Sequence, residues 1–320
     1  MTILTKNIPT AEIIRQAHES IEPFIHRTPI MTNRSINDIS GARIYFKCEN
    51  FQKVGAFKFR GATNAVLSLS DEEKQRGVAT HSSGNHAQGL ALAARIQGID
   101  AYIVMPENAP TVKRKAVEEY GAKVIPCAPT LKSRKDTLQK VIEQTGAVTI
   151  HPFDDYRIIA GQATAAKELI EDEGNFDIIM APVGGGGLLS GTALSCLYWS
   201  PKTKVIAGEP SGADDAYRSM KAGTIVPCAN PATIADGLLT TLSVKTFGII
   251  KNHVSEIITV TDEEIVHAMR TIWERMKIII EPSCAVPFAA LLKRKEIFAG
   301  RKTGIILTGG NVDLGKLPFR

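Results

Sequence analysis

Residues 177–199, which read DIIMAPVGGGGLLSGTALSCLYW, contain the stretch that decides the fold. The apolar run from Asp177 to Val183 has the length and composition of a buried strand, and Leu188 to Trp199 is long enough for a helix. Four consecutive glycines join the two segments. A strand, a glycine turn and a helix in this order predict one unit of an α/β fold.

The glycine turn, Gly184 to Gly187, predicts an anion site, because its backbone N–H groups and the positive end of the following helix both favour a phosphate. A tight turn without a ligand is the alternative, although four glycines carry a high entropic cost for a turn alone. No Lys-Ser/Thr pair follows, which excludes a Walker A loop, and Leu189 and Ser190 break the pattern G-x-G-x-x-G. Glu209, at the end of the next strand, still allows a dinucleotide-binding fold.

Strand-like and helix-like segments alternate on both sides of this unit. The further strands are expected at Ala42–Lys47, Gly77–His81, Ala101–Met105, Ala122–Pro126, Lys204–Gly208 and Thr303–Leu307, and the further helices at Phe57–Leu69, Asn85–Gln97, Thr111–Tyr120 and Leu131–Gln144. The alternation predicts parallel sheets covered by helices on both faces. We expect residues 68–147 to form a small domain inserted into a large one made of residues 1–67 and 148–320.

Composition limits the classes of function. The net charge is +5, but Lys and Arg are mixed with Asp and Glu along the chain, which argues against a nucleic-acid partner. The five cysteines form no CxxC pair, so neither a disulfide framework nor a zinc site is expected. Met1 to Thr10 lacks the apolar core of a signal peptide, and no run is long enough for a membrane span. We therefore expect a cytoplasmic protein.

Two further motifs lie at helix starts. Ser82-Ser83-Gly84-Asn85-His86 suits either a simple helix cap or a carboxylate site built from backbone N–H groups. Phe57-Lys58-Phe59-Arg60-Gly61 places a lysine between two aromatic residues. That lysine is either an ordinary amphipathic-helix residue or an amine whose pKa is lowered by apolar surroundings, as Schiff-base chemistry requires.

Two motifs follow strands near the end of the chain. Thr308-Gly309-Gly310-Asn311 is a turn by its composition. Glu209-Pro-Ser-Gly-Ala213-Asp214-Asp215 gathers acidic oxygens and free carbonyls that suit a hard divalent cation. Helix capping by Ser211 or Asp214 is the alternative for the acidic segment.

Taken in order, these motifs resemble those of fold-type II pyridoxal-phosphate (PLP) enzymes, the tryptophan-synthase-β-like fold. They are most similar to the group of serine racemases, threo-3-hydroxyaspartate dehydratases and serine/threonine dehydratases. The resemblance runs from His26-Arg27-Thr28-Pro29 to Gly310-Asn311-Val312-Asp313. It implies two domains, parallel sheets and a PLP cofactor.

The resemblance also implies a role for each motif. Lys58 would form the Schiff base and move the α-proton, with Ser83 on the opposite face of the substrate. Thr308 would meet the pyridine nitrogen, and a neutral hydroxyl there departs from the Asp partner of other PLP enzymes in a way that suits β-elimination. Phe57 would pack on the ring, Asn85 would bind its hydroxyl, Gly184, Gly185, Gly186 and Gly187 would hold the phosphate, and Ser82, Ser83 and His86 would surround the substrate carboxylate.

Finer details point to a subgroup. Glu209, the Ala213 carbonyl and Asp215 resemble the Mg²⁺ (or Ca²⁺/Mn²⁺) site of serine racemases and hydroxyaspartate dehydratases. Trp273-Glu-Arg-Met-Lys277 and Glu281-Pro-Ser283 resemble the same subgroup, and Ala56, where most of the family has Ser, is shared with some of its members. Arg134 would face the distal carboxylate of a diacid substrate, although a solvated helix position is the alternative.

These features predict a PLP-dependent ammonia-lyase, a racemase or both, acting on L-threo-3-hydroxyaspartate, L-serine or both. The resemblance further implies a homodimer, a small amino-acid substrate and no membrane partner, and it raises activation by ATP, for which the sequence has no separable motif. A catabolic threonine dehydratase is the nearest alternative. An NAD-dependent oxidoreductase and a non-catalytic anion-binding module are alternatives of other classes.

Overall fold

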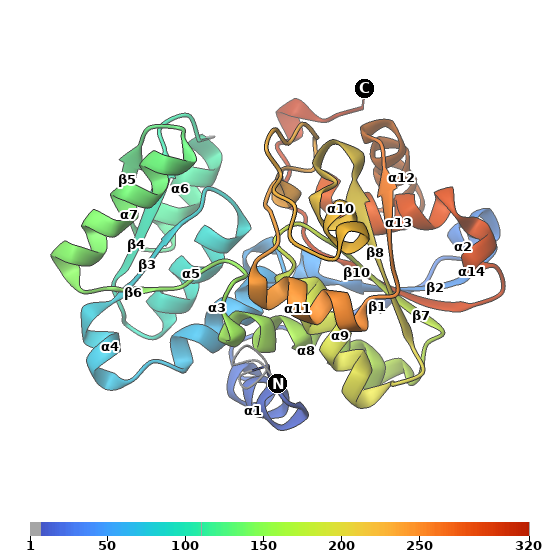
Figure 1. Cartoon of the computed structure of the whole chain (residues 1–320), viewed down its shortest axis with the longest axis horizontal. Coiled ribbons are helices and arrows are strands. Elements are labelled where there is room, and N and C mark those ends of the chain that lie inside the picture. Colours follow the sequence, from blue (N-terminus) through green and yellow to red (C-terminus); the bar gives the residue numbers. More distant parts are fainter. Residues whose placement is uncertain (1–7, 110, 320) are drawn as a thin grey trace.

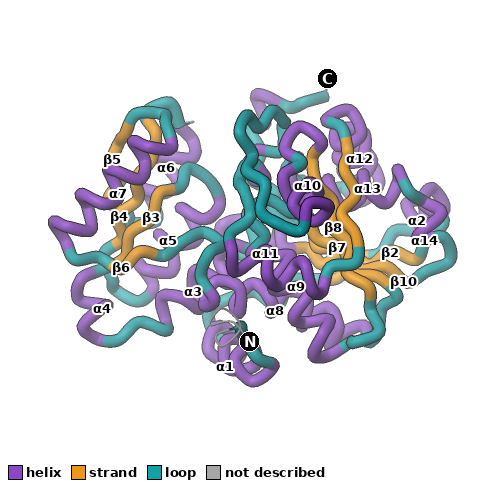
Figure 2. Tube along the Cα trace, viewed as in Figure 1, coloured by secondary structure: helices purple, strands orange, loops and turns teal. Residues whose placement is uncertain are grey.

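The computed structural model describes residues 8–109 and 111–319. Residues 1–7, which include most of the Met1–Thr10 stretch, and residue 320 lie outside the described part. Figures 1 and 2 show two lobes, each built on its own sheet, with helices on both sides of the strands. The described helices are α1 (Ala11–Ile21), α2 (Arg34–Ser40), α3 (Lys58–Leu67), α4 (Asp71–Arg76), α5 (Asn85–Ile96), α6 (Thr111–Glu119), α7 (Leu131–Thr145), α8 (Tyr156–Glu173), α9 (Gly187–Trp199), α10 (Asp215–Ala222), α11 (Val244–His253), α12 (Asp262–Met276), α13 (Pro282–Lys293) and α14 (Lys295–Phe298).

The larger sheet has six strands in the order β1-β2-β10-β7-β8-β9. Adjacent strands of this sheet are parallel, except that β1 is antiparallel to β2. The first and last strands along the chain that build its parallel part, β2 and β10, are adjacent. The strands are β1 (Ile30–Met31), β2 (Arg43–Cys48), β7 (Ile178–Pro182), β8 (Lys204–Pro210), β9 (Glu256–Val260) and β10 (Lys302–Leu307).

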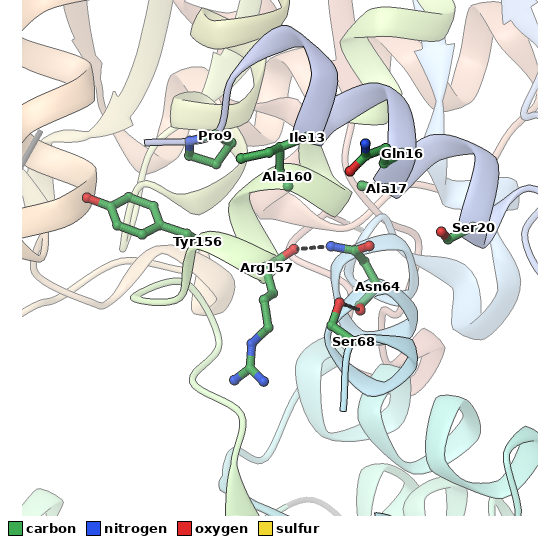
Figure 3. Close-up of a pocket in the computed structure, with 10 residues that line it drawn as sticks. All are labelled: Pro9, Ile13, Gln16, Ala17, Ser20, Asn64, Ser68, Tyr156, Arg157 and Ala160. Atoms are coloured by element: carbon green, nitrogen blue, oxygen red, sulfur yellow. Dashed lines mark hydrogen bonds between the residues drawn. The ribbon is translucent and has the colours of Figure 1, made fainter. Parts of the chain in front are cut away.

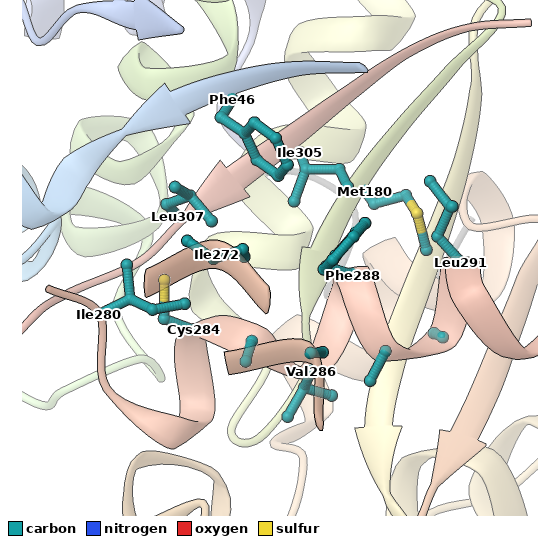
Figure 4. Packing of buried hydrophobic residues seen from close by; sticks show 14 of the residues in the cluster. Phe46, Met180, Ile272, Ile280, Cys284, Val286, Phe288, Leu291, Ile305 and Leu307 are labelled. Atoms are coloured by element: carbon teal, nitrogen blue, oxygen red, sulfur yellow. The ribbon is translucent and has the colours of Figure 1, made fainter. Parts of the chain in front are cut away.

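Both faces of the larger sheet are buried, which explains why its strands are continuous apolar runs. Along β7, Ile178 and Met180 pack on one side with α12 and α13, whereas Ile179 and Ala181 pack on the other with α8 and α9. Figure 4 shows the first of these cores, where the rings of Phe46 and Phe288 meet edge to face at 5.9 Å. The alternation is the period of two expected for a strand.

The smaller sheet has four parallel strands in the order β5-β4-β3-β6. Helix α5 packs on one face, and α7 covers the other. Because β6 pairs with β3, this sheet extends two residues past the expected boundary at 147. We propose that the small domain ends at residue 149 rather than 147. The strands are β3 (Val78–His81), β4 (Ala101–Pro106), β5 (Lys123–Cys127) and β6 (Val148–Thr149).

The motifs follow the carboxyl ends of strands, where ligands bind in open α/β sheets. The glycine turn follows β7, and the Thr308 loop follows its neighbour β10. The acidic segment begins with the last two residues of β8, and Ser82 follows β3 of the smaller sheet. In the described part of the chain, no helix combines the length and the apolarity that crossing a bilayer requires.

Candidate active site

Lys58 is the first residue of α3, a helix that packs against α5 of the smaller lobe and α8 of the larger one (Figure 1). Its Nζ donates a hydrogen bond to the Pro152 carbonyl at 3.0 Å and lies 5.2 Å from the centre of the Phe57 ring. Burial lowers the pKa of Lys58 to about 8, although the negative charge of Glu281 opposes the shift. A lysine in this state is a neutral nucleophile for part of the time near neutral pH.

The Thr308 loop is bonded to the segment before Lys58. Phe57 donates its N–H to the Thr308 carbonyl at 3.0 Å, and Gly310 donates to Gly55 at 2.9 Å. The buried Thr308 hydroxyl lies beside the Cys284 thiol and has no nitrogen or oxygen partner among the described residues. A buried hydroxyl without such a partner is suited to a ring nitrogen of a bound cofactor.

Asn85, the first residue of α5, connects the small sheet's lobe to this loop. Its Nδ2 donates to Glu281 Oε1 at 2.8 Å, and its Oδ1 accepts from Asn311 Nδ2 at 2.9 Å. Burial and the charge of Asp236 raise the pKa of Glu281 to about 7. The side-chain nitrogen of Asn85 has two N–H groups, and Glu281 accepts a hydrogen bond from one of them.

The glycine turn has the close contacts that require glycine. A Cβ at Gly185 would meet the Phe153 ring at 2.2 Å, and one at Gly184 would meet the Leu238 Cα at 2.9 Å. Gly186 has φ +85°, a conformation that other residues rarely adopt. Among the described residues no side chain caps α9, which begins at Gly187, so its first N–H groups suit a phosphate.

The Ser82–His86 motif also lies at an uncapped helix start. Gly84 is the N-cap of α5 and has no side chain to cap the helix, while the Ser82 hydroxyl accepts the Gly84 N–H at 3.4 Å. Ser82 and Ser83 are half-buried. His86 is buried with Nε2 bonded to the Ile150 carbonyl at 3.1 Å, and burial together with the charge of Lys58 lowers its pKa to about 3. His86 is therefore neutral.

The acidic segment forms a buried pair of carboxylates at the end of β8. Glu209 accepts the N–H groups of Ala216 and Tyr217, both at 2.8 Å, and so caps α10 in place of Ser211 or Asp214. Burial raises the pKa of Glu209 to about 8 and that of Asp215 to about 6.

Asp215 has an oxygen that suits a cation. Its Oδ2 is buried and has no hydrogen-bond partner among the described residues. Glu209, Asp215 and the Ala213 carbonyl are hard oxygen donors of the kind that Mg²⁺ and Ca²⁺ prefer. No group of three or more His, Cys, Asp or Glu side chains in the described ranges could hold a metal, so carbonyls and water would have to complete the shell.

Arg134 lies in the first turns of α7 and is half-buried, unlike the exposed Lys132 and Lys135 beside it. Its Nε is buried without a hydrogen-bond partner among the described residues. Burial lowers the pKa of His81, the residue before Ser82, and the nearby positive charge of Arg134 lowers it further. Arg134 thus lies near the end of β3 rather than in open solvent.

The segment after β6 contributes residues that the sequence analysis missed. The His151 ring lies 4.6 Å from the Phe153 ring and 6.5 Å from the His81 ring, and its Nδ1 accepts the Asp154 N–H at 2.9 Å. Pro152 supplies the carbonyl that binds Lys58. No glycine run or charge pair marks this segment, and Glu281 is distinguished in the sequence only by the motif Glu281-Pro-Ser283, so the pattern does not predict that either lies near Lys58.

Two hollows adjoin these elements. One of about 390 Å³ has Gly310 and Asn311 of the Thr308 loop in its wall, together with Asn50, Phe51, Gly55, Lys277, Ile278 and Ile279. The other, of about 300 Å³, lies between α1, α3 and α8 (Figure 3), and none of the expected site residues lines it.

Comparison with known proteins gives consistent matches. The family described as "Pyridoxal-phosphate dependent enzyme" matches residues 21–309. The beta-hydroxyaspartate dehydratase of Paracoccus denitrificans is 53% identical, covering 98% of this chain and 99% of that protein. The L-threo-3-hydroxyaspartate ammonia-lyase of Saccharomyces cerevisiae is 46% identical, covering 96% of this chain and 94% of that protein. The crystal structure of serine racemase from Dictyostelium discoideum superimposes with a TM-score of 0.91 at 51% identity, covering 95% of this chain and 99% of that one.

Proposed function

This chain belongs to the family of pyridoxal-phosphate dependent enzymes, and from that premise we propose that it removes ammonia from small β-hydroxy amino acids. The substrate first loses water and regains it when the resulting imine is hydrolysed, so that ammonia is the net loss. L-threo-3-hydroxyaspartate would give oxaloacetate, and L-serine would give pyruvate. The relatives named as hydroxyaspartate dehydratase and hydroxyaspartate ammonia-lyase support this substrate class. The NAD-dependent alternative has no support from these matches.

One observation carries the proposal: the glycine turn and the Thr308 loop follow adjacent strands, β7 and β10, and Lys58 comes directly after the residue that bonds to Thr308. When bound, PLP supplies an aldehyde for the lysine and a ring that withdraws electrons from the substrate's α-carbon. The N–H groups of Gly184–Gly187 would hold its phosphate, Thr308 its ring nitrogen and Asn85 its hydroxyl. Phe57 would pack against the ring.

The chain's own residues would perform the proton chemistry. The Lys58 amine would take the α-proton, and its lowered pKa leaves part of it neutral for that purpose. Backbone N–H groups at the start of α5, with Ser82, Ser83 and His86 around them, would bind the α-carboxylate. Arg134 would bind the second carboxylate of hydroxyaspartate.

The direct test is turnover of three substrates side by side. Purified protein with PLP is mixed with L-threo-3-hydroxyaspartate, L-serine or L-threonine, and the keto acid and ammonia are quantified. We expect hydroxyaspartate, L-serine or both to be consumed faster than threonine. A preference for threonine would identify a threonine dehydratase instead, and no turnover of any of the three would refute the proposal.

Racemisation on the same site is the second candidate, favoured by the serine racemase structure that this chain resembles. It requires an acid or base on each face of the α-carbon, and we propose Lys58 for one face and Ser83 for the other. Ser83→Ala should lower D-serine production and D-serine consumption more than L-serine elimination, measured by chiral chromatography. Ser82→Ala, at a residue proposed only to bind the α-carboxylate, is the comparison and should lower turnover of both enantiomers alike. An equal loss on both enantiomers in Ser83→Ala would make Ser83 a binding residue only.

We propose that Glu209, Asp215 and the Ala213 carbonyl bind Mg²⁺ or a similar divalent cation. Treatment with a chelator should lower the melting temperature and the activity, because the two buried acidic side chains would then lack the cation that offsets the cost of burying their charge. Added Mg²⁺ should restore both, and Asp215→Asn should remove the response while Asp214→Asn, at a residue paired with Arg218, should keep it. Unchanged behaviour after chelation, with no bound metal found by elemental analysis, would contradict the site.

We also propose that the protein is a cytoplasmic homodimer. Phe51 and Ile279 are large apolar side chains that remain exposed in the single chain, and both lie in the wall of the hollow of about 390 Å³. Covering such a surface favours association of two copies.

A further inference from the structure

A cluster of fully buried charged side chains includes Arg60, two residues after Lys58. Arg60, in the first turn of α3, is completely inaccessible to solvent, as are Lys47 and Glu49, while Glu168 of α8 is equally buried. These four residues come from β2, the segment after it, α3 and α8. Two are positive and two are negative, so the cluster is electrically balanced.

Arg60 makes the most contacts in this cluster. Its guanidinium binds Glu49 through Nε and Nη2 at 2.7 and 2.8 Å, and it binds Glu168 through Nη1 and Nη2 at 2.7 and 2.8 Å. Nη1 also donates to the Thr164 hydroxyl at 3.1 Å. Although burial alone would lower it, the pKa of Arg60 is raised because both carboxylates favour its charged form.

The remaining charges and hydroxyls are satisfied as well. Lys47 donates to Glu168 at 2.6 Å and to the Thr28 carbonyl at 2.7 Å, and the Thr28 hydroxyl donates to Glu49 at 2.5 Å. His18 of α1 contacts Glu168 at 3.2 Å. Five separate parts of the chain are therefore joined through one guanidinium and two carboxylates: α1, the segment around Thr28, β2 with the segment after it, α3 and α8.

Beside this cluster, the backbones of helices α3 and α8 are in close contact. A Cβ on Gly161 would come within 2.6 Å of the Gly61 Cα, and the Gly61 N–H donates to Gln162 at 3.2 Å. One turn further along, Asn64 donates to the Arg157 carbonyl at 2.7 Å, as Figure 3 shows. The first two turns of α3, which begin at Lys58, are thus fixed against α8.

Stability alone does not account for such a cluster. Apolar side chains of similar volume commonly stabilise a core as well as a buried ion network does, because the network must first lose its hydration. Apolar side chains do not fix the orientation of their neighbours in this way. A guanidinium that binds two carboxylates through paired N–H groups is held in one orientation. Here the oriented group is two residues from the amine of the site.

We propose that Arg60 is a positioning residue for Lys58. By binding Glu49 and Glu168 together, it fixes the first turn of α3 and holds the Lys58 amine where it meets the cofactor's aldehyde. Because Arg60 is completely buried, it would act through the helix rather than by contact with the substrate. This inference rests on the proposed role of Lys58.

The test compares holoenzymes. Arg60→Lys keeps the charge but loses the paired geometry, and we expect the visible absorption band of lysine-bound PLP to change its pH midpoint. We also expect PLP to be lost on dilution at least about tenfold faster. Glu49→Gln should act in the same direction, and it decides the question if Arg60→Lys does not fold.

Two controls separate positioning from stability. Arg157→Lys makes the same chemical change at a half-buried arginine of α8 that pairs with Asp155, and Ile272→Val weakens the core of the larger sheet. Both should lower the melting temperature at most, leaving the band and the PLP loss rate unchanged. If Arg60→Lys and Glu49→Gln behave like these controls, the cluster is only structural and the inference is wrong. If the unmodified protein binds PLP through no lysine at all, the proposed function has failed instead.

Discussion

Replacing Lys58 by alanine is expected to abolish turnover and the visible absorption band of the PLP-bound protein. Lys58 is the lysine whose amine is buried between the Phe57 ring and the Pro152 carbonyl, with a pKa lowered to about 8. The variant loses both the group that bonds the cofactor and the base that takes the α-proton. Loss of a general base alone typically costs about 10² to 10⁴ in rate, so activity should fall at least that far.

Lys53→Ala is the matched control for this prediction. Lys53 lies five residues earlier and contacts the Phe59 ring from 5.8 Å, and it has no proposed part in the chemistry. The control should keep its absorption band and most of its activity. Full activity in Lys58→Ala, measured with each of the three substrates, would end the account of this site.

Arg134→Ala is expected to change the choice of substrate. Serine has one carboxylate, whereas hydroxyaspartate has a second whose burial without a partner would be costly. The half-buried guanidinium of Arg134, with its unpartnered Nε near His81, suits that carboxylate. We expect kcat/KM for hydroxyaspartate to fall at least about tenfold, equivalent to about 1.4 kcal/mol, with a much smaller loss for L-serine.

Two companion variants sharpen the result. Arg134→Lys keeps the charge without the paired N–H groups and should fall between the native protein and alanine for hydroxyaspartate. Lys132→Ala, on an exposed side chain of the same helix, should change neither substrate. Equal losses for both substrates in Arg134→Ala, or no loss, would remove Arg134 as the selector.

The sequence predicted much of the α/β alternation because buried strands and glycine turns leave local signals. The strand before Gly184 and the helix after it are present, and the matching family confirms the resemblance drawn from the motif order. Helix α8, with 18 residues, was not predicted. Its residues 158–170 are all buried, including Lys167 and Glu168. This part of α8 therefore has no exposed polar face, which is the feature that makes a surface helix recognisable in a sequence.

The contacts that sequence reasoning could not reach are those between distant segments. Nothing local to Arg60 or Glu168 shows that two charged side chains are completely buried, because burial depends on partners that are far away in the sequence. The same holds for Pro152, whose carbonyl accepts a hydrogen bond from Lys58 although the whole small domain separates the two residues in the sequence. The composition of a motif predicts which chemistry a residue can perform, whereas the partners that tune it follow from the tertiary fold.

Every role proposed for this site depends on Lys58 carrying the cofactor. The most direct measurement is to load the protein with PLP, reduce it with borohydride, digest it and locate the phosphopyridoxyl group by mass spectrometry. We expect the label to lie on Lys58 and the modified peptide to be absent from Lys58→Ala. A label on any other lysine, or a PLP-saturated protein that retains none after reduction, would contradict it.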